Sequence, residues 1–405
     1  MSFVTPITTP ANARDFNYNL GGLYGVQSGT NFNSLTVEDL FSASIPAAIG
    51  STLLEGPLTL DPKFLGIHLS EPAQCARIKA GTISTHDSGM GRWSQMNPIQ
   101  GRFYDGKSTG AGYVDTDLKG LLKAIKASGA DSFHKIYESP TWASARPAEG
   151  NSPYGMPGGR AEPSNMTYLT DFVTWLMNYC GEYIDYLGVW NEPKYNTLSS
   201  SYYSGTPAKL AEMARVINLA AKAVKPSIKI VGVDCTGVTS NGVGSGIDYF
   251  GQFLAASDGS GGTGKDWIDI LSVHPYESAA NDLNLIPPVK GFLDNLKTAN
   301  SVTGKVVWST EWGYVNPTFN NYTGPVAARM KALFRYALLN IVAGMERCIS
   351  YHYTGNMGWS SSPEGDRLWN EMVSILNGGA VVTRINRIGL RGALACVING
   401  KNYLV

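Results

Sequence analysis

Two glutamates in this chain each lie near the end of a short apolar run. Glu192 belongs to Tyr186–Pro193, which reads Tyr-Leu-Gly-Val-Trp-Asn-Glu-Pro, and Glu311 belongs to Lys305–Gly313, which reads Lys-Val-Val-Trp-Ser-Thr-Glu-Trp-Gly. The apolar residues predict buried strands, and Pro193 ends the first because it lacks a ladder donor. Two carboxylates on two strand ends are the minimum that cleavage of a glycosidic bond requires. The alternative is that one or both are ion-paired structural acids.

The elements that must position these glutamates alternate between strand and helix. Eight strands are predicted, at Phe64–Leu69, Gly81–His86, Ser132–Tyr137, Ile184–Trp190, Ile228–Val233, Ile268–Val273, Lys305–Ser309 and Cys348–Tyr353. Helix-period segments occupy Leu118–Ser128, Thr167–Tyr183, Pro207–Val224, Ile247–Ala256, Val289–Ala299, Pro325–Ala343 and Arg367–Leu376. This alternation predicts an α/β protein with a parallel (β/α)₈ TIM barrel, whose strand carboxyl ends carry the chemistry. The competitor, an open doubly wound sheet, would usually show a Gly-rich turn after an early strand, and none follows Phe64–Leu69.

Three regions follow from this pattern. Residues 1–62 are expected to form an N-terminal extension with one helix beginning at Thr36, and residues 63–377 to form the barrel. Residues 378–405 are expected to form a small C-terminal β appendage, because Asn399-Gly400 between two apolar runs is a hairpin signal.

Composition excludes several function classes. Lys plus Arg and Asp plus Glu number 32 each, so no electrostatic footprint for nucleic acid or an anionic membrane is expected. The five cysteines are scattered without a Cys-x-x-Cys pair, which favours buried thiols over disulfides or a zinc site. No signal peptide and no membrane-length apolar run is visible. The location is therefore left open between the cytoplasm, export without a cleavable leader, and export by a leader that the given sequence lacks. The oligomeric state is not predicted.

All five histidines fall on or just after predicted strands, which leaves a metal-dependent barrel hydrolase open as an alternative. Their spacing opposes it, because the chain contains neither a His-x-His on the first strand nor a His-Glu-x-x-His. We therefore expect no metal and no cofactor, and we expect His134, early in its strand, to be a core residue.

Several short motifs resemble those of one enzyme group. Trp190-Asn191-Glu192-Pro193 resembles the acid/base motif of the retaining glycoside hydrolases of clan A, and Thr310-Glu311-Trp312-Gly313 resembles their nucleophile motif. Further matches are His86-Asp87-Ser88-Gly89, Ser139 to Ser144 and His274-Pro275-Tyr276. Together they are most similar to glycoside hydrolase family 39, across residues 63–376. The chain departs from the group in carrying Ser84 where many members have an arginine, and in ending too soon for a large β-sandwich.

The resemblance implies roles for these residues. Glu311 would be the nucleophile and Glu192 the acid/base of a double displacement on a poly- or oligosaccharide, without a cofactor. The pKa of Glu192 should then be raised by burial and by the charge of Glu311. His274 and Tyr276 would contact the nucleophile or the sugar.

Other residues are expected to bind substrate. Asn191 could donate to a sugar 2-hydroxyl, and the remaining candidates are His86, Asp87, Trp142 and Trp359. The two tryptophans could equally be loop anchors, and His274 and Tyr276 could be a structural hydrogen-bond pair. If Glu311 points into the barrel, strict alternation turns Trp308 toward the helices as packing. A catalytically silent carbohydrate-binding barrel, or a structural module of a larger particle, remains the alternative from another class.

Overall fold

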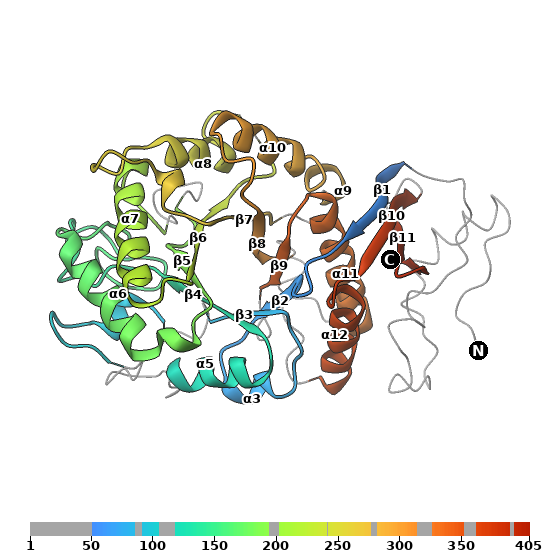
Figure 1. Ribbon diagram of the computed structural model, residues 1–405, viewed down its shortest axis with the longest axis horizontal. Helices are drawn as coiled ribbons and strands as arrows, with labels where there is room; N and C mark the ends of the chain where they lie inside the picture. Colours follow the sequence, from blue (N-terminus) through green and yellow to red (C-terminus); the bar gives the residue numbers. More distant parts are fainter. Residues whose placement is uncertain are drawn as a thin grey trace.

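Eight parallel strands close into a barrel that helices surround (Figure 1). The structure is a computed structural model, and it describes residues 51–85, 91–104, 118–193, 202–240, 242–276, 282–313, 326–351, 362–388 and 393–405. The barrel strands are β2 (Leu65–His68), β3 (Thr82–Ser84), β4 (Asp131–Ile136), β5 (Tyr186–Val189), β6 (Lys229–Thr236), β7 (Ile270–His274), β8 (Val307–Trp312) and β9 (Arg347–Ser350). They pair in chain order, and β9 closes on β2 with Leu65 opposite Cys348. The predicted (β/α)₈ barrel is confirmed.

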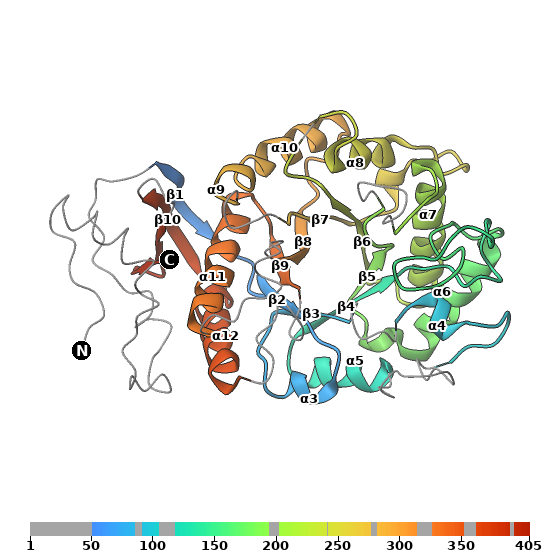
Figure 2. The ribbon, with the colours of Figure 1, turned by 180° about the vertical axis from the view of Figure 1, so that it is seen from behind.

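The helices cover the outside of the barrel (Figure 2). They are α3 (Pro72–Cys75), α4 (Trp93–Met96), α5 (Leu118–Ala127), α6 (Met166–Cys180), α7 (Pro207–Val224), α8 (Gly246–Ala255), α9 (Asp282–Leu285), α10 (Val289–Ala299), α11 (Val326–Val342) and α12 (Pro363–Leu376). Each of the seven predicted helices overlaps one of these. Helix α7 begins at Pro207 because Thr206 caps it, its side chain accepting a hydrogen bond from the Lys209 backbone N–H. The helix predicted at Thr36 lies outside the described residues.

A second sheet of four antiparallel strands lies beside α11 and α12 (Figure 1). It is ordered β1 (Thr52–Thr59), β10 (Val381–Ile388), β11 (Ala393–Ile398) and β12 (Lys401–Leu404). The predicted hairpin at Asn399-Gly400 joins β11 to β12, and Phe334 of α11 packs edge-on against Tyr403 of β12. Strand β1 comes from the predicted N-terminal extension, so the appendage is built from both ends of the described chain.

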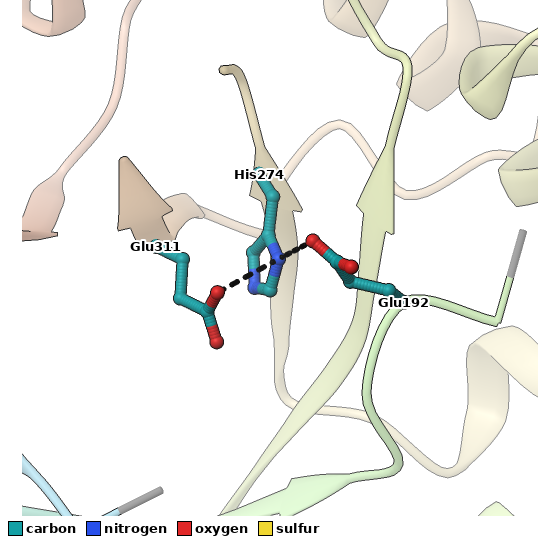
Figure 3. Close-up of side chains that lie close together, drawn as sticks. All are labelled: Glu192, His274 and Glu311. Atoms are coloured by element: carbon teal, nitrogen blue, oxygen red, sulfur yellow. Dashed lines mark hydrogen bonds and ion pairs between the residues drawn. The ribbon is translucent and has the colours of Figure 1, made fainter. Parts of the chain in front are cut away.

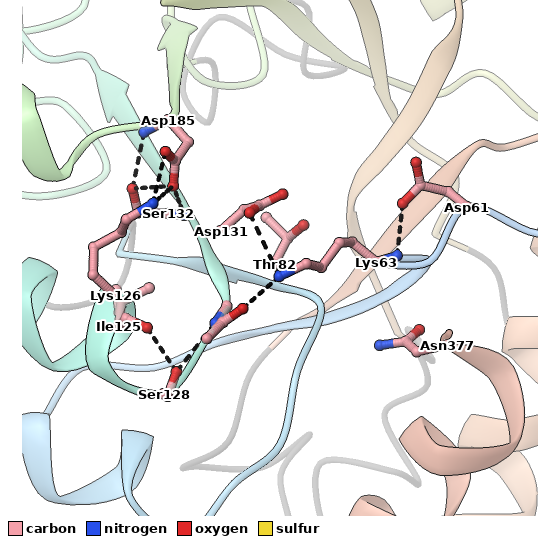
Figure 4. Close-up of polar contacts among 12 residues, drawn as sticks. Asp61, Lys63, Thr82, Ile125, Lys126, Ser128, Asp131, Ser132, Asp185 and Asn377 are labelled. Atoms are coloured by element: carbon pink, nitrogen blue, oxygen red, sulfur yellow. Dashed lines mark hydrogen bonds and ion pairs between the residues drawn. The ribbon is translucent and has the colours of Figure 1, made fainter. Parts of the chain in front are cut away.

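Polar contacts connect strands and helices at the amino end of the barrel (Figure 4). The Asp185 carboxylate accepts hydrogen bonds from the Lys126 ammonium at 2.9 Å and the Ser132 backbone N–H at 3.0 Å. The Asn377 side-chain amide, just after α12, pairs with the backbone of Leu65, receiving its N–H at 2.7 Å. In barrels of this kind the amino end serves stability, so these contacts position the strands from the end opposite to the chemistry.

One orientation expected from the sequence is wrong. Trp308 packs against Phe133, Val231, Ile270 and Ile349 of other barrel strands, in a cluster to which no helix residue that the structure describes contributes. It therefore lies inside the barrel rather than against the helices. The reason is a register shift in β8 between Ser309 and Trp312, which breaks strict alternation before Glu311. Trp308 is still a packing residue, buried to 1% exposure, as expected.

Two expectations drawn from the composition concern the cysteines and membrane-spanning helices. All five cysteines are buried thiols. Among the described residues, no helix is both long enough and apolar enough to cross a membrane.

Candidate active site

The two glutamates meet at the carboxyl end of the barrel. Glu192 follows β5 and Glu311 lies in β8, and both side chains are nearly fully buried. Trp190 and Glu192 both adopt left-handed backbone angles, with φ of 62° and 39°. Such angles are rare outside glycine and persist only where the surroundings hold them. The Trp190 side chain is fixed in this turn, because its Nε1–H donates to the Tyr202 carbonyl at 2.8 Å.

An imidazole lies between the two carboxylates (Figure 3). His274, the last residue of β7, has its Nδ1 2.8 Å from Glu192 Oε1 and 3.5 Å from Glu311 Oε2. It is fully buried. Ligand-type atoms of all three side chains lie within 4.8 Å of one another. The two glutamates are therefore close enough to act on the same bond.

Glu311 is held at both carboxylate oxygens. The Lys135 ammonium of β4 donates to Oε1 at 2.8 Å, and the Tyr276 hydroxyl donates to Oε2 at 3.1 Å. The contact of Tyr276 with Glu311 is of the kind expected from the resemblance. Ser84, which stands where many clan members have an arginine, is buried in β3. The cation beside the nucleophile candidate is therefore a lysine from the next strand.

Lys135 has further partners in the same region. Its ammonium lies 2.8 Å from Asp234 Oδ2 of β6 and donates to Asn191 Oδ1 at 3.1 Å. Asp234 Oδ2 lies 3.7 Å from His274 Nε2. The buried groups Glu192, His274, Asp234, Lys135 and Glu311 thus form one continuous polar cluster that links both glutamates.

The charges in this cluster shift one another's pKa values. Burial alone raises the pKa of Asp234, but the charge of Lys135 and the proximity of His274 outweigh it and hold the pKa far below its usual range. Burial alone lowers the pKa of Lys135, but Asp234 and Glu311 outweigh it and raise the pKa above its ordinary value. Asp234 and Lys135 are therefore charged throughout the physiological range.

The pKa values of His274 and Glu192, on the other side of the cluster, are both raised. Burial and the Lys135 charge lower the pKa of His274, but Glu311, Asp234 and Glu192 outweigh them and raise it to about 9. Burial raises the pKa of Glu192, and the charge of Glu311 adds to this against the opposing effect of His274. These are the two causes expected from the sequence. His274 Nδ1 and Glu192 Oε1, 2.8 Å apart, share a hydrogen bond.

The same side chains could in principle offer ligands to a metal. Within the described ranges, Glu192, His274 and Glu311 form a group whose ligand-type atoms all lie within 4.8 Å of one another. The Lys135 ammonium already occupies Glu311 Oε1, however, and a second cation beside it would be repelled. The arrangement suits proton transfer and nucleophilic attack better than cation binding.

The other predicted residues lie in different places. Trp142 donates its Nε1–H to the Asn97 carbonyl at 2.8 Å and packs edge-on against Tyr168 of α6. These are the contacts of a loop anchor, the alternative left open by the sequence. His134 is fully buried and bonds Thr85 through Nδ1 at 2.8 Å, as expected of a core residue. His86, Asp87 and Trp359 lie outside the described residues.

Sequence reasoning missed Lys135 and Asp234. Lys135 lies inside the predicted buried strand Ser132–Tyr137, and a charge in a buried strand is a signal for a buried partner. Asp234 follows directly after the predicted strand Ile228–Val233, which is the same strand-end signal that identified Glu192. What the sequence could not supply is the pairing, because β4, β6 and β8 meet only when the barrel closes.

Comparisons with known proteins identify a family and several similar solved structures. Residues 160–373, more than half of the chain, match the family model described as glycosyl hydrolase catalytic core. A search of curated proteins found no match. Among solved structures, a family 39 glycoside hydrolase from the gut symbiont Bacteroides cellulosilyticus WH2 is similar, with 17% identity and a TM-score of 0.55 over 86% of this chain and 71% of that one.

Two further solved structures have the same fold. A family 39 β-xylosidase from Caulobacter crescentus has 17% identity and a TM-score of 0.52, covering 85% of this chain and 76% of its own. A glucosidase from Croceicoccus marinus has 13% identity and a TM-score of 0.54, covering 86% and 76%. At these identities the similarity concerns the fold.

Proposed function

Since this chain belongs to the glycosyl hydrolase catalytic core family, we propose that it cleaves O-glycosidic bonds of a poly- or oligosaccharide with retention of anomeric configuration. One observation carries the proposal: Glu192 and Glu311 face each other across His274, with carboxylate oxygens no more than 4.8 Å apart. Retaining enzymes hold their carboxyl groups about 5 to 5.5 Å apart, whereas inverting enzymes need roughly 6.5 to 9.5 Å to admit a water. The spacing supports retention.

The protonation states suit the two roles. Glu192, whose pKa is raised by burial, starts protonated and serves as general acid. Glu311, bound to Lys135 at 2.8 Å, starts as the carboxylate nucleophile. With Lys135 and His274 positive and Asp234 negative, the five groups then sum to zero charge. A neutral cluster can remain buried without an uncompensated charge.

In the first step, a Glu311 oxygen attacks the anomeric carbon while the bond from that carbon to the leaving oxygen breaks. The leaving oxygen takes the proton of Glu192, and Glu311 becomes a neutral ester. Glu192 becomes a carboxylate beside the His274 Nδ1–H, 2.8 Å away. Because one negative charge is lost at Glu311 and one is gained at Glu192, the cluster stays neutral and His274 stabilises the new charge.

In the second step, Glu192 takes a proton from a water molecule, whose oxygen bonds to the anomeric carbon. The ester bond breaks, and Glu311 leaves as the carboxylate beside Lys135. Two displacements on the same carbon restore the original configuration.

Asn191 is arranged to hold the sugar. Its side-chain oxygen accepts from Lys135 at 3.1 Å, which turns the amide so that its NH₂ group is the donor available to substrate. This supports the predicted contact with a sugar 2-hydroxyl. Such a contact strengthens in the transition state of glycoside hydrolysis.

A polysaccharide panel tests the proposal. Release of reducing ends is measured with wild type and with Glu311→Gln, which keeps the shape of the side chain and removes its charge. We expect the wild type to release reducing ends from at least one polysaccharide and the variant to release none. Equal release by both proteins would remove Glu311 from the mechanism, and a wild type inactive on every sugar class would favour the silent binding barrel.

A further inference from the structure

Lys135 and Asp234 form an ion pair that solvent does not reach. Lys135 is fully buried and Asp234 is 1% exposed, and the ammonium and carboxylate are 2.8 Å apart. The same ammonium donates to Glu311 Oε1, also at 2.8 Å. A buried ammonium requires partners at close range, because desolvation of a charge is costly. Two carboxylates therefore share one cation inside the barrel, and one of them is Glu311.

The backbone is shaped to aim Asp234 at this lysine. Asp234 has a left-handed φ of 55° and lies where β6 shifts register against β7, between Gly232 and Cys235. Its carboxylate accepts from the Thr310 hydroxyl at 2.5 Å, and its backbone N–H donates to Ser272 Oγ at 2.9 Å. Register shifts beside active sites commonly redirect a side chain. Both ends of Asp234 are thus fixed by neighbouring strands.

The barrel also leaves space for Lys135. A Cβ added to Gly188 of β5 would lie 2.8 Å from Lys135 Cγ and 3.0 Å from the Phe133 ring. Both distances are too short for a side chain at position 188. Glycine there lets the lysine stem run along the interior toward Glu311.

We propose that Lys135 and Asp234 act as a positioning pair: Lys135 holds the nucleophile carboxylate of Glu311 in place, and Asp234 anchors Lys135 and weakens its hold on that carboxylate. This inference rests on the proposed function, in which Glu311 is the nucleophile. Asp234 has two effects of its own. It fixes the direction of the ammonium, and its negative charge opposes the negative charge of Glu311 across that ammonium.

The pair predicts the direction in which the acid limb of the pH profile should shift. This limb is the part at low pH where activity rises as the nucleophile Glu311 loses its proton. Among the described residues, His274, Tyr276 and Glu192 also face Glu311, and none of them is replaced in the variants below. Lys135→Met removes a cation from Glu311, so the limb should move up by about one pH unit or more. Asp234→Asn removes an opposing anion, so the limb should move down.

Activity should fall in both variants. Lys135→Met leaves the Glu311 carboxylate without the contact that orients it, and we expect kcat to fall by about 10²-fold with a smaller change in KM. In Asp234→Asn the lysine pairs with Glu311 alone, which makes the carboxylate a weaker nucleophile, so kcat should again fall. The double variant Lys135→Met/Asp234→Asn removes one charge of each sign, and its limb should return toward that of wild type.

Two measurements decide the outcome. The pH profile of kcat/KM is recorded on a polysaccharide that the wild type cleaves. In parallel, ¹³C NMR follows the titration of protein labelled at the glutamate side-chain carboxyls, with the Glu311 resonance identified by its loss in Glu311→Gln. If Lys135→Met does not fold, Asp234→Asn and the double variant, in which the net charge is unchanged, still show the direction in which the Glu311 titration shifts.

Opposite shifts in the single variants support the pair. Shifts in the same direction, or an unchanged Glu311 titration in folded variants, would overturn it while leaving glycoside hydrolysis intact. Conversely, a wild type that cleaves no polysaccharide would end the proposed function, and the NMR titration would still show whether the pair controls the charge of Glu311.

Discussion

At the scale of single residues, the site depends on two raised pKa values. Burial raises the pKa of Glu192, and the pKa of His274 is raised because Glu311, Asp234 and Glu192 outweigh its burial. The carboxylate motif predicted the first of these from sequence. The raised pKa of His274 could not be predicted from sequence. It depends on tertiary contacts such as the 2.8 Å distance between His274 Nδ1 and Glu192 Oε1, which only the structure shows.

Replacing the acid should separate the two chemical steps. Glu192→Gln is expected to slow polysaccharide cleavage by about 10² to 10⁴-fold, the usual contribution of a general acid or base. Aryl glycosides with good leaving groups need no acid, so their first step should be spared and the glycosyl-enzyme should accumulate. Mass spectrometry of the intact protein should then show the added sugar, located on the peptide that contains Glu311. An adduct on any other residue contradicts the assignment.

The His274 proton should also appear in the stability of the fold. The pKa of this group rises from 6.5 in the unfolded chain to about 9 in the folded protein. Its contribution is therefore fully present below about pH 6.5 and is lost as pH rises through 9, and it is on the order of 3 kcal/mol at most. Denaturant unfolding at pH 6 and pH 9 should show a larger loss in wild type than in His274→Gln. Equal losses would mean that folding does not raise the pKa of His274.

At the scale of elements, local patterns predicted more than long-range pairings. Apolar runs and helical periodicity identified all eight barrel strands and seven helices, because each signal lies within one element. The register shift in β8 turned Trp308 inward, and the left-handed Asp234 redirected a side chain in β6. Both depend on neighbouring strands. The pairing of β1 with β10 is likewise invisible in either strand alone.

The glycine in β5 offers a test at this scale. Gly188→Ala places a methyl group 2.8 Å from Lys135 Cγ, so the lysine must move away from Glu311. We expect kcat to fall by about 10²-fold, with about 1 to 3 kcal/mol of lost stability from overpacking. The matched control is Gly291→Ala in α10, where an added Cβ meets nothing within 4 Å. Full activity of Gly188→Ala in a steady-state assay would show that the position of Lys135 is not critical.

At the scale of the whole molecule, the barrel gathers side chains from strands that are far apart in the chain. The cluster takes residues from β4, β6, β7 and β8 and from the turn after β5, all at one end of the barrel. The opposite end is fastened by contacts such as that of Asn377 with Leu65. This division explains why the chemistry could be located from strand ends in the sequence, whereas its cationic partner could not.

Activity of the whole protein should not depend on a metal. Proton transfer and covalent catalysis by Glu192 and Glu311 require only carboxylates, and Lys135 already supplies a positive charge at Glu311. Turnover should therefore be unchanged after prolonged dialysis against EDTA. Loss of turnover that added zinc restores would instead support the metal-dependent hydrolase.

The most direct test of the central claim is the configuration of the product as it first forms. Proton NMR of the anomeric signals, recorded during hydrolysis of a polysaccharide of known linkage and before mutarotation, distinguishes the two outcomes. A double displacement through Glu311, supported by carboxylate oxygens within 4.8 Å of each other, predicts that the first-formed sugar keeps the anomeric configuration of the substrate. A first-formed product with the inverted anomer would contradict the assignment of Glu311 as nucleophile.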